Sequence, residues 1–296
     1  MKITFILPAI GKKKNEKYIG TWKMEPLTIA VLKSLTPDSV ETAFYDDRIE
    51  LIDYDAPTDL VAITVETYTA RRAYAIAEQF SSRGVHVVMG GYHVTLFPEE
   101  AMRHAGTIVT GNAESCWAAM LEDFRRGRAR SRYDGSRDFA AGSAANGFPL
   151  PDKSIFQGKK YLPVALVETG RGCVHSCNFC AISSFYGRRY CGRDIRSVCL
   201  DIERARSRYY FLADDNLIAD RKNAMRLFEA IAPYRIKWAG QGTLTMASDG
   251  ELLRAMKKSG CELILTGFES LETQSLRQMD KGFMTGLATD EAVKRI

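Results

Sequence analysis

Short apolar runs alternate with amphipathic segments along the first 125 residues of the chain. Continuous runs of aliphatic and β-branched side chains predict buried parallel strands at residues 2–8, 40–46, 59–65, 85–91 and 106–114. Apolar residues at helical spacing predict helices between them, at residues 25–35, 69–84 and 98–105. Repeated strand–helix units with short connections favour a doubly wound, Rossmann-like parallel sheet over residues 1–125.

The pattern changes at residue 126. Residues 126–160 are polar and rich in Gly, Ser and Arg, which predicts a linker with little structure of its own. The alternation then resumes and defines a second α/β domain over residues 161–296. Its strands are expected at residues 161–170, 208–216, 236–244 and 261–270, and its helices at 194–206, 221–234, 249–260 and from 275.

Composition narrows the classes of protein that fit. The 296 residues are 46% hydrophobic and 26% charged, as in ordinary globular proteins. The net charge of +5 is scattered, with basic clusters only at Lys12–Lys14 and Arg125–Arg132, so no nucleic-acid partner is expected. The first apolar run stops at Pro8, and no run reaches the ~18 apolar residues of a membrane span. We therefore expect a cytoplasmic protein.

Four of the seven cysteines fall within residues 168–192. An odd number of cysteines without secretory context argues against a disulfide framework, and clustered cysteines in a reducing compartment more often hold metal. Cys173, Cys177 and Cys180 have the spacing C-x3-C-x2-C and directly follow a predicted strand, where α/β proteins bind ligands. Three thiolates leave one iron of a four-iron cluster with an open position, which is useful if a substrate must bind the metal.

Two other readings of these cysteines remain open. A structural zinc site would take His175 or Cys191 as its fourth ligand, although zinc sites usually pair two ligand knuckles and only one is visible. A closed electron-transfer cluster would use Cys191, although nothing else in the chain resembles a ferredoxin. The remaining cysteines are expected to pack as small apolar residues: Cys116, Cys199 and Cys261.

The segment RGCVHSCNFC, residues 171–180, resembles the cysteine loop of radical S-adenosylmethionine (SAM) enzymes. The resemblance implies that Cys173, Cys177 and Cys180 hold a [4Fe–4S] cluster whose fourth iron binds the amino and carboxylate groups of SAM. Electron transfer then cleaves SAM to methionine and a 5′-deoxyadenosyl radical, which abstracts hydrogen from a substrate. Phe179 takes the place of the aromatic residue that packs near the adenine. Cys191 departs from the pattern, since relatives often carry arginine there.

Polar residues also follow the other three strands of the second domain, and the resemblance makes them candidate SAM contacts: Asp214, Asp215, Asn216, Gln241 and Glu269. An ordinary helix cap is the alternative for one of the two aspartates. An ion pair with Arg277 or Lys281 is the alternative for Glu269. Gly172 is expected to permit a tight turn at the start of the cysteine loop.

The segments VVMGGYHVTLFPEEA and IVTGNAES resemble the cobalamin-binding domain that precedes the radical SAM barrel in one large subgroup. The resemblance implies that turns after the third, fourth and fifth strands contact cobalamin: Thr64, Glu66, Thr67, Gly90, Gly91, Tyr92, His93, Gly111 and Glu114. The Asp-x-His-x-x-Gly signature for a lower cobalt ligand is absent, and the region reads YDDRIELIDYD. His93 is a substitute ligand in one reading and a surface histidine in the other.

Together these features predict an N-terminal Rossmann-like domain followed by a partial TIM-like radical SAM (β/α) barrel. Family barrels have six strand–helix units and only four are visible, which predicts an unpaired edge strand and an exposed apolar face. Either the chain is a fragment or the missing strands come from elsewhere, so independent activity is open.

The resemblance implies a radical SAM enzyme that uses cobalamin for methylation, rearrangement or cyclisation at an unactivated carbon. Its partners would be a small-molecule substrate and an electron donor such as flavodoxin or ferredoxin. One alternative is a radical SAM enzyme without cobalamin. The other is a non-catalytic metal-binding fragment or interaction module.

Overall fold

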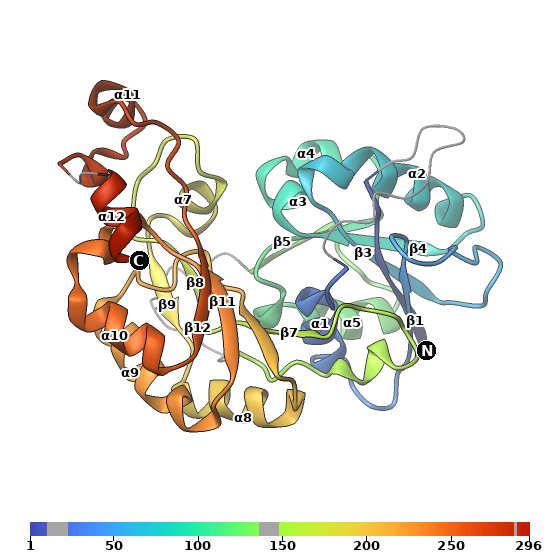
Figure 1. Ribbon diagram of the computed structural model, residues 1–296. Coiled ribbons are helices and arrows are strands. Elements are labelled where there is room, and N and C mark those ends of the chain that lie inside the picture. The colour runs from blue at the N-terminus through green and yellow to red at the C-terminus, as the bar shows by residue number, and fades with distance from the viewer. Residues whose placement is uncertain (11–22, 136–147, 287–288) are drawn as a thin grey trace. The chain divides into compact units, whose positions relative to one another are not determined.

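The computed structural model describes residues 1–10, 23–135, 148–286 and 289–296. Lys12–Lys14 and the middle of the predicted linker lie outside the described residues. The chain forms two compact units, Met1–Leu162 and Pro163–Ile296, and each has its own hydrophobic core (Figure 1). Both units are α/β, as the sequence predicts.

The first unit contains a six-stranded, fully parallel sheet with the order β2-β1-β3-β4-β5-β6. Its strands are β1 (Lys2–Leu7), β2 (Glu41–Asp46), β3 (Leu60–Thr64), β4 (His86–Gly90), β5 (Thr107–Gly111) and β6 (Arg132–Gly135). The order reverses beside β1, because β2 lies on one side of it and β3 on the other. This is the strand arrangement of a doubly wound fold.

Helices cover both faces of this sheet. Helices α1 (Leu27–Ser34) and α5 (Trp117–Arg125) lie on one face, and α2 (Ala70–Ser81), α3 (Tyr92–Leu96) and α4 (Pro98–Ala101) lie on the other (Figure 1). Sandwiched between them, all five residues of β3 are buried. This explains why β3 reads as a continuous apolar run rather than an alternating one.

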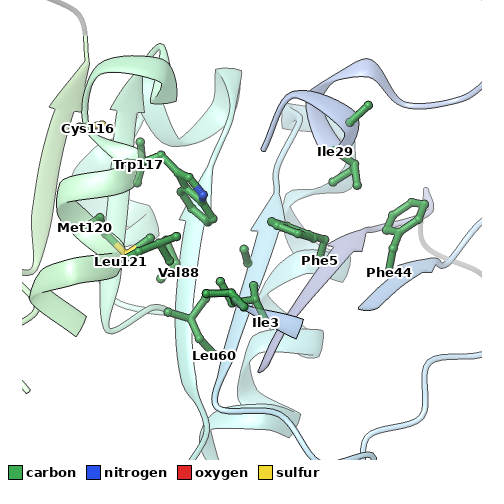
Figure 2. Close-up of a cluster of buried hydrophobic side chains, with 14 of the residues drawn as sticks. Ile3, Phe5, Ile29, Phe44, Leu60, Val88, Cys116, Trp117, Met120 and Leu121 are labelled. Carbon is green, nitrogen blue, oxygen red and sulfur yellow. The ribbon is translucent and has the colours of Figure 1, made fainter. Parts of the chain in front are cut away.

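Side chains of β3 divide between the two faces. Leu60 belongs to the core beneath α1 and α5, where Phe5 and Trp117 lie with ring centroids 6.0 Å apart (Figure 2). Val61 and Ile63 belong to the opposite core beneath α2. The doubly wound sheet is therefore stabilised by two separate apolar layers.

The structure differs from the sequence prediction within residues 126–160. Strand β6 joins the sheet there, and a 3-10 turn at Lys153–Phe156 follows it. Only alternate residues of β6 are buried, because it is a short edge strand, and its sequence is therefore too polar to stand out. Phe156 packs edge-on against Phe44, with centroids 5.7 Å apart, so the first unit extends to Leu162.

The second unit contains a four-stranded parallel sheet with the order β12-β11-β10-β7. Its strands are β7 (Val164–Val167), β10 (Tyr209–Leu212), β11 (Lys237–Gln241) and β12 (Cys261–Leu265). Helices α8 (Ile195–Ala205), α9 (Arg221–Ile231) and α10 (Gly250–Lys258) contribute to its core. Neighbouring strands follow chain order, as in a (β/α) barrel.

Shorter elements complete the second unit. Strands β8 (Gly170–Gly172) and β9 (Tyr190–Gly192) form an antiparallel pair, and the remaining helices are α7 (Ala181–Tyr186), α11 (Thr273–Gln278) and α12 (Thr289–Arg295). In the described part of the sheet β12 is an edge strand, and Leu263 and Leu265 are 51% and 41% exposed. The predicted edge strand with exposed apolar side chains is therefore present. Among the residues that the structure describes, no helix is both long enough and apolar enough to cross a membrane.

Candidate functional site

The cysteine loop begins at the β8–β9 pair, beyond the carboxyl end of β7. Gly172 closes β8 opposite Tyr190 and has φ +84°. A Cβ at Gly172 would collide with the carbonyl oxygen of Arg189, so only glycine fits this crossing of two backbones. The tight turn expected here is confirmed.

The three thiols of the loop lie close enough to influence one another. Burial raises the pKa of the Cys177 thiol, the charge of Lys281 lowers it, and Cys180 and Cys173 raise it further. A raised thiol pKa disfavours the thiolate until a metal takes the place of the proton. A metal bound to Cys177 would therefore offset both its burial and the repulsion from neighbouring thiolates.

Thiolates suit both zinc and an iron–sulfur cluster, in which each thiolate binds a different iron. Over the described ranges, no three His, Cys, Asp or Glu side chains gather as they would around one metal ion. Of the two candidate fourth ligands of a zinc site, the His175 ring stacks on Phe283 with centroids 3.6 Å apart. Cys191 lies on β9 opposite Arg171.

The residues after β10 support the cysteine loop directly. The Asp215 carboxylate accepts the Gly172 N–H at 2.7 Å, and Asn216 Nδ2 donates to the Cys173 sulfur at 3.4 Å. Asn216 is only 2% exposed, so its amide is fixed in place. Both residues were predicted to contact SAM. In the structure, both form hydrogen bonds to the loop that carries the thiols.

Asp214 is fully buried and faces the backbone of the neighbouring strand. Its carboxyl oxygens accept the backbone N–H and the hydroxyl of Thr169, both at 2.6 Å. Burial raises its pKa to about 7. Helix α9 takes its N-cap from Asp220, so the helix-cap alternative is wrong for Asp214 and Asp215. Asp214 instead joins the carboxyl ends of β7 and β10.

Glu269 follows β12 with φ +55°, and its carboxylate forms an ion pair with Lys281. The Lys281 ammonium also donates to the Gly267 carbonyl oxygen at 2.8 Å, and the residue is 6% exposed. The ion-pair alternative is therefore the arrangement that the structure contains. Gln241 ends β11 with its backbone carbonyl bonded to Leu217 N–H.

A segment far along the chain holds the cysteine loop from outside, and we call residues 278–283 the clasp. Asn178 donates its backbone N–H to Met279 O at 3.2 Å and its side-chain amide to Gln278 O at 2.8 Å. The His175 ring stacks on Phe283 with centroids 3.6 Å apart. Sequence analysis missed the clasp, because no local pattern reports a contact across 100 residues. Phe179, the predicted adenine contact, is 53% exposed beside it.

The predicted cobalamin contacts of the first unit lie after three adjacent strands, β3, β4 and β5. Gly91 follows β4 with φ +110°, and a Cβ there would lie 2.8 Å from the Val65 carbonyl oxygen. Glu66 caps a 3-10 turn at Thr67–Thr69, and burial raises the pKa of its carboxyl to about 7. Other predicted cobalamin contacts are Thr64 at the end of β3, Gly90 at the end of β4, Gly111 at the end of β5 and Glu114 in the turn at Ala113–Ser115.

Tyr92 and His93 lie in helix α3 rather than in a turn. His93 is 5% exposed and its Nε2 lies 2.9 Å from the Tyr74 hydroxyl and 3.5 Å from the Glu100 carboxylate. The alternative of a surface histidine is therefore wrong. Its ring is held by Tyr74 of α2 and Glu100 of α4.

The other cysteines pack as expected. Cys116 lies in the core of the first unit, and Cys199 and Cys261 pack against the core of the second. Burial raises the pKa of Cys261 to about 11, which keeps its thiol protonated.

Comparison with known proteins adds independent information. No family model matches the chain. It is 31% identical over 277 residues to bacteriochlorophyllide d C-8(2)-methyltransferase of Chlorobaculum tepidum, covering 86% of this chain and 60% of that protein. It is also 31% identical over 276 residues to the C-12(1)-methyltransferase of the same organism, covering 87% and 58%. The chain thus spans about 60% of the length of these relatives.

The fold has a solved counterpart. The radical SAM methyltransferase TsrM from Kitasatospora setae, solved with cobalamin and a [4Fe–4S] cluster bound, matches with a TM-score of 0.72 and 15% identity. The match covers 99% of this chain and 66% of that one. The described chain is an α/β protein in which a doubly wound unit precedes a second parallel sheet, and the loop beyond β7 carries Cys173, Cys177 and Cys180. In sequence it is similar to the two bacteriochlorophyllide methyltransferases, and in fold it is similar to the radical SAM methyltransferase TsrM.

Proposed function

We propose that this chain is the cofactor-binding portion of a cobalamin-dependent radical SAM enzyme that methylates an unactivated carbon of a small molecule. The observation that carries the proposal is the set of three interacting thiols, Cys173, Cys177 and Cys180, backed by Asn216. The methyltransferases among its relatives support methylation over rearrangement or cyclisation. A low-potential donor such as flavodoxin or ferredoxin supplies the electron, in the cytoplasm.

Cys173, Cys177 and Cys180 would hold a [4Fe–4S] cluster. The cluster with SAM would supply radical chemistry, and cobalamin would supply the methyl group. The chain's own part is positioning. Asp215 fixes the turn at Gly172, Asn216 orients Cys173, and the clasp holds the far side of the loop. Phe179 is exposed and available to stack on the adenine.

The first unit offers a surface suited to a broad, flat ligand. Gly90 and Gly91 form a tight turn at the carboxyl end of β4, packed against the backbones of Val109 and Val65, and this end of a parallel sheet is where α/β proteins bind ligands. Glu66 has a pKa of about 7, so near neutral pH its carboxyl is partly protonated and donates a hydrogen bond to an amide or carboxylate of the ligand. No histidine is needed as a lower cobalt ligand in this proposal.

The test is anaerobic reconstitution with iron and sulfide, followed by EPR of the reduced cluster with and without SAM. We expect one [4Fe–4S]+ signal that changes when SAM is added. Zinc in place of iron, or a signal that SAM leaves unchanged, would refute an open iron site. Added hydroxocobalamin should remain with the chain through gel filtration; loss of its absorbance would favour a radical SAM enzyme without cobalamin.

A further inference from the structure

Lys281 places a buried positive charge beside the cysteine loop. The residue is 6% exposed, and its ammonium is held by the Gly267 carbonyl oxygen and the Glu269 carboxylate. Burying an ammonium is costly unless hydrogen bonds and an opposite charge compensate it. Both a hydrogen bond and an opposite charge are present, so the buried ammonium of Lys281 is compensated.

The residues that flank Lys281 contact the cysteine loop. Met279 O accepts the Asn178 N–H at 3.2 Å, and the Phe283 ring stacks on His175 with centroids 3.6 Å apart. The clasp that carries Lys281 is bonded to Asn178, which lies between two of the ligands. The segment that carries Lys281 is therefore held against the cysteine loop by hydrogen bonds and ring stacking.

A nearby cation changes how easily an iron–sulfur cluster is reduced. Reduction adds one electron and no proton, so the cluster becomes more negative by one charge. Cluster potentials depend on net charge, hydrogen bonds to sulfur and solvent exposure, and a charge acts more strongly where water is excluded. An ammonium stabilises the reduced form, and a carboxylate beside it weakens that effect.

We propose that the positive charge of Lys281 raises the reduction potential of the cluster. The Glu269 carboxylate limits this rise by partly neutralising the ammonium. This inference rests on the proposed function, because it concerns the cluster held by Cys173, Cys177 and Cys180. It gives the Glu269–Lys281 ion pair a role that does not require direct contact with SAM.

The experiment is an EPR-monitored redox titration of the reconstituted chain without SAM. We expect Lys281→Met to lower the equilibrium constant for one-electron reduction at least tenfold, which is 59 mV for a one-electron couple. Lys281→Arg keeps the charge and should stay near the wild-type potential. Glu269→Gln keeps a hydrogen-bond acceptor but removes the opposing charge, so its potential should rise.

Lys258→Met is the matched control, because Lys258 is an exposed lysine at the end of α10 and its loss should leave the potential unchanged. A wild-type chain that assembles no cluster contradicts the proposed function. A cluster whose potential is the same in wild type and Lys281→Met overturns the inference alone, as does an equal fall in Lys281→Arg. If Lys281→Met loses the cluster, Glu269→Gln decides, and a potential that stays or falls there overturns the inference.

Discussion

Asp214 is a fully buried carboxyl group that accepts hydrogen bonds from the backbone N–H and the hydroxyl of Thr169. Its pKa rises from an ordinary value of 3.8 to about 7 because burial disfavours the charged form. The folded protein therefore binds this proton more tightly than the unfolded chain. The stability that the group contributes is complete below pH 3.8 and is lost as the pH rises through about 7.

Replacing Asp214 with Asn should remove this pH dependence. Asparagine is neutral at every pH and keeps an acceptor for the Thr169 N–H. The stability of wild type relative to Asp214→Asn should therefore fall between pH 5 and pH 8. Hydrogen exchange of the β7 and β10 amides in increasing urea measures it. A difference that is the same at both pH values would contradict a protonated Asp214.

Cys177 and Cys191 lie in the same stretch of sequence but in different surroundings. Cys177 is buried among the other loop thiols, whereas Cys191 lies on β9 opposite Arg171. Cys177→Ala should abolish iron incorporation, and Cys191→Ala should leave the iron content unchanged. Iron and sulfide analysis after reconstitution measures both. Loss of iron in Cys191→Ala would mean that the cluster is closed by four thiolates.

At the scale of elements, the turns after the strands carry most of the site. Gly91 follows β4 with φ +110°, in a region that only glycine occupies readily, and faces the Val65 backbone. Gly84 ends the turn after α2 with φ +77° and has open space around it. A substitution at Gly84 therefore tests backbone strain alone, whereas a substitution at Gly91 tests strain and steric collision together.

Gly84→Ala should lower the free energy of unfolding by about 1–2 kcal/mol, because alanine adopts the left-handed conformation only at a steric cost. Gly91→Ala should cost about 3 kcal/mol or more, because strain and collision with the Val65 carbonyl oxygen add. Urea denaturation of both variants measures the difference. Equal losses would show that the turn after β4 moves aside freely.

Sequence could predict an element where a local pattern reported its environment. The five buried residues of β3 have such a pattern, and so do the three cysteines with their fixed spacing. Strand β6 could not be predicted, because its alternate residues are exposed at the sheet edge. Glu269 was found by position but its partner was left open, because the Lys281 ion pair depends on how the chain turns back after α11.

At the scale of the whole molecule, each unit has its own core and its own set of candidate contacts. The first unit buries two apolar layers on the two faces of its sheet. The second unit buries one large core and a smaller cluster around Leu244, Leu276 and Met284. The predicted cobalamin contacts all lie in Met1–Leu162, and the cluster ligands all lie in Pro163–Ile296. The two cofactors should therefore be separable.

Residues 1–162 and 163–296, produced as separate chains, should each fold. The first should retain added hydroxocobalamin without binding iron, and the second should assemble the cluster without retaining corrinoid. Circular dichroism checks the fold, and absorbance with iron analysis checks the cofactors. If corrinoid is retained only when both pieces are present, its site is not confined to the first unit.

The clasp also has a consequence for synthesis on the ribosome. The Asn178 side-chain amide donates a hydrogen bond to the carbonyl oxygen of Gln278, 100 positions later in the chain. At about 5–20 residues per second, the cysteine loop is made about 5–20 s before the segment that holds it. During that interval Asn178 lacks its partners and the stacking partner of His175 does not yet exist. Iron–sulfur delivery during translation would therefore meet an open loop, and completion of the clasp would come afterwards.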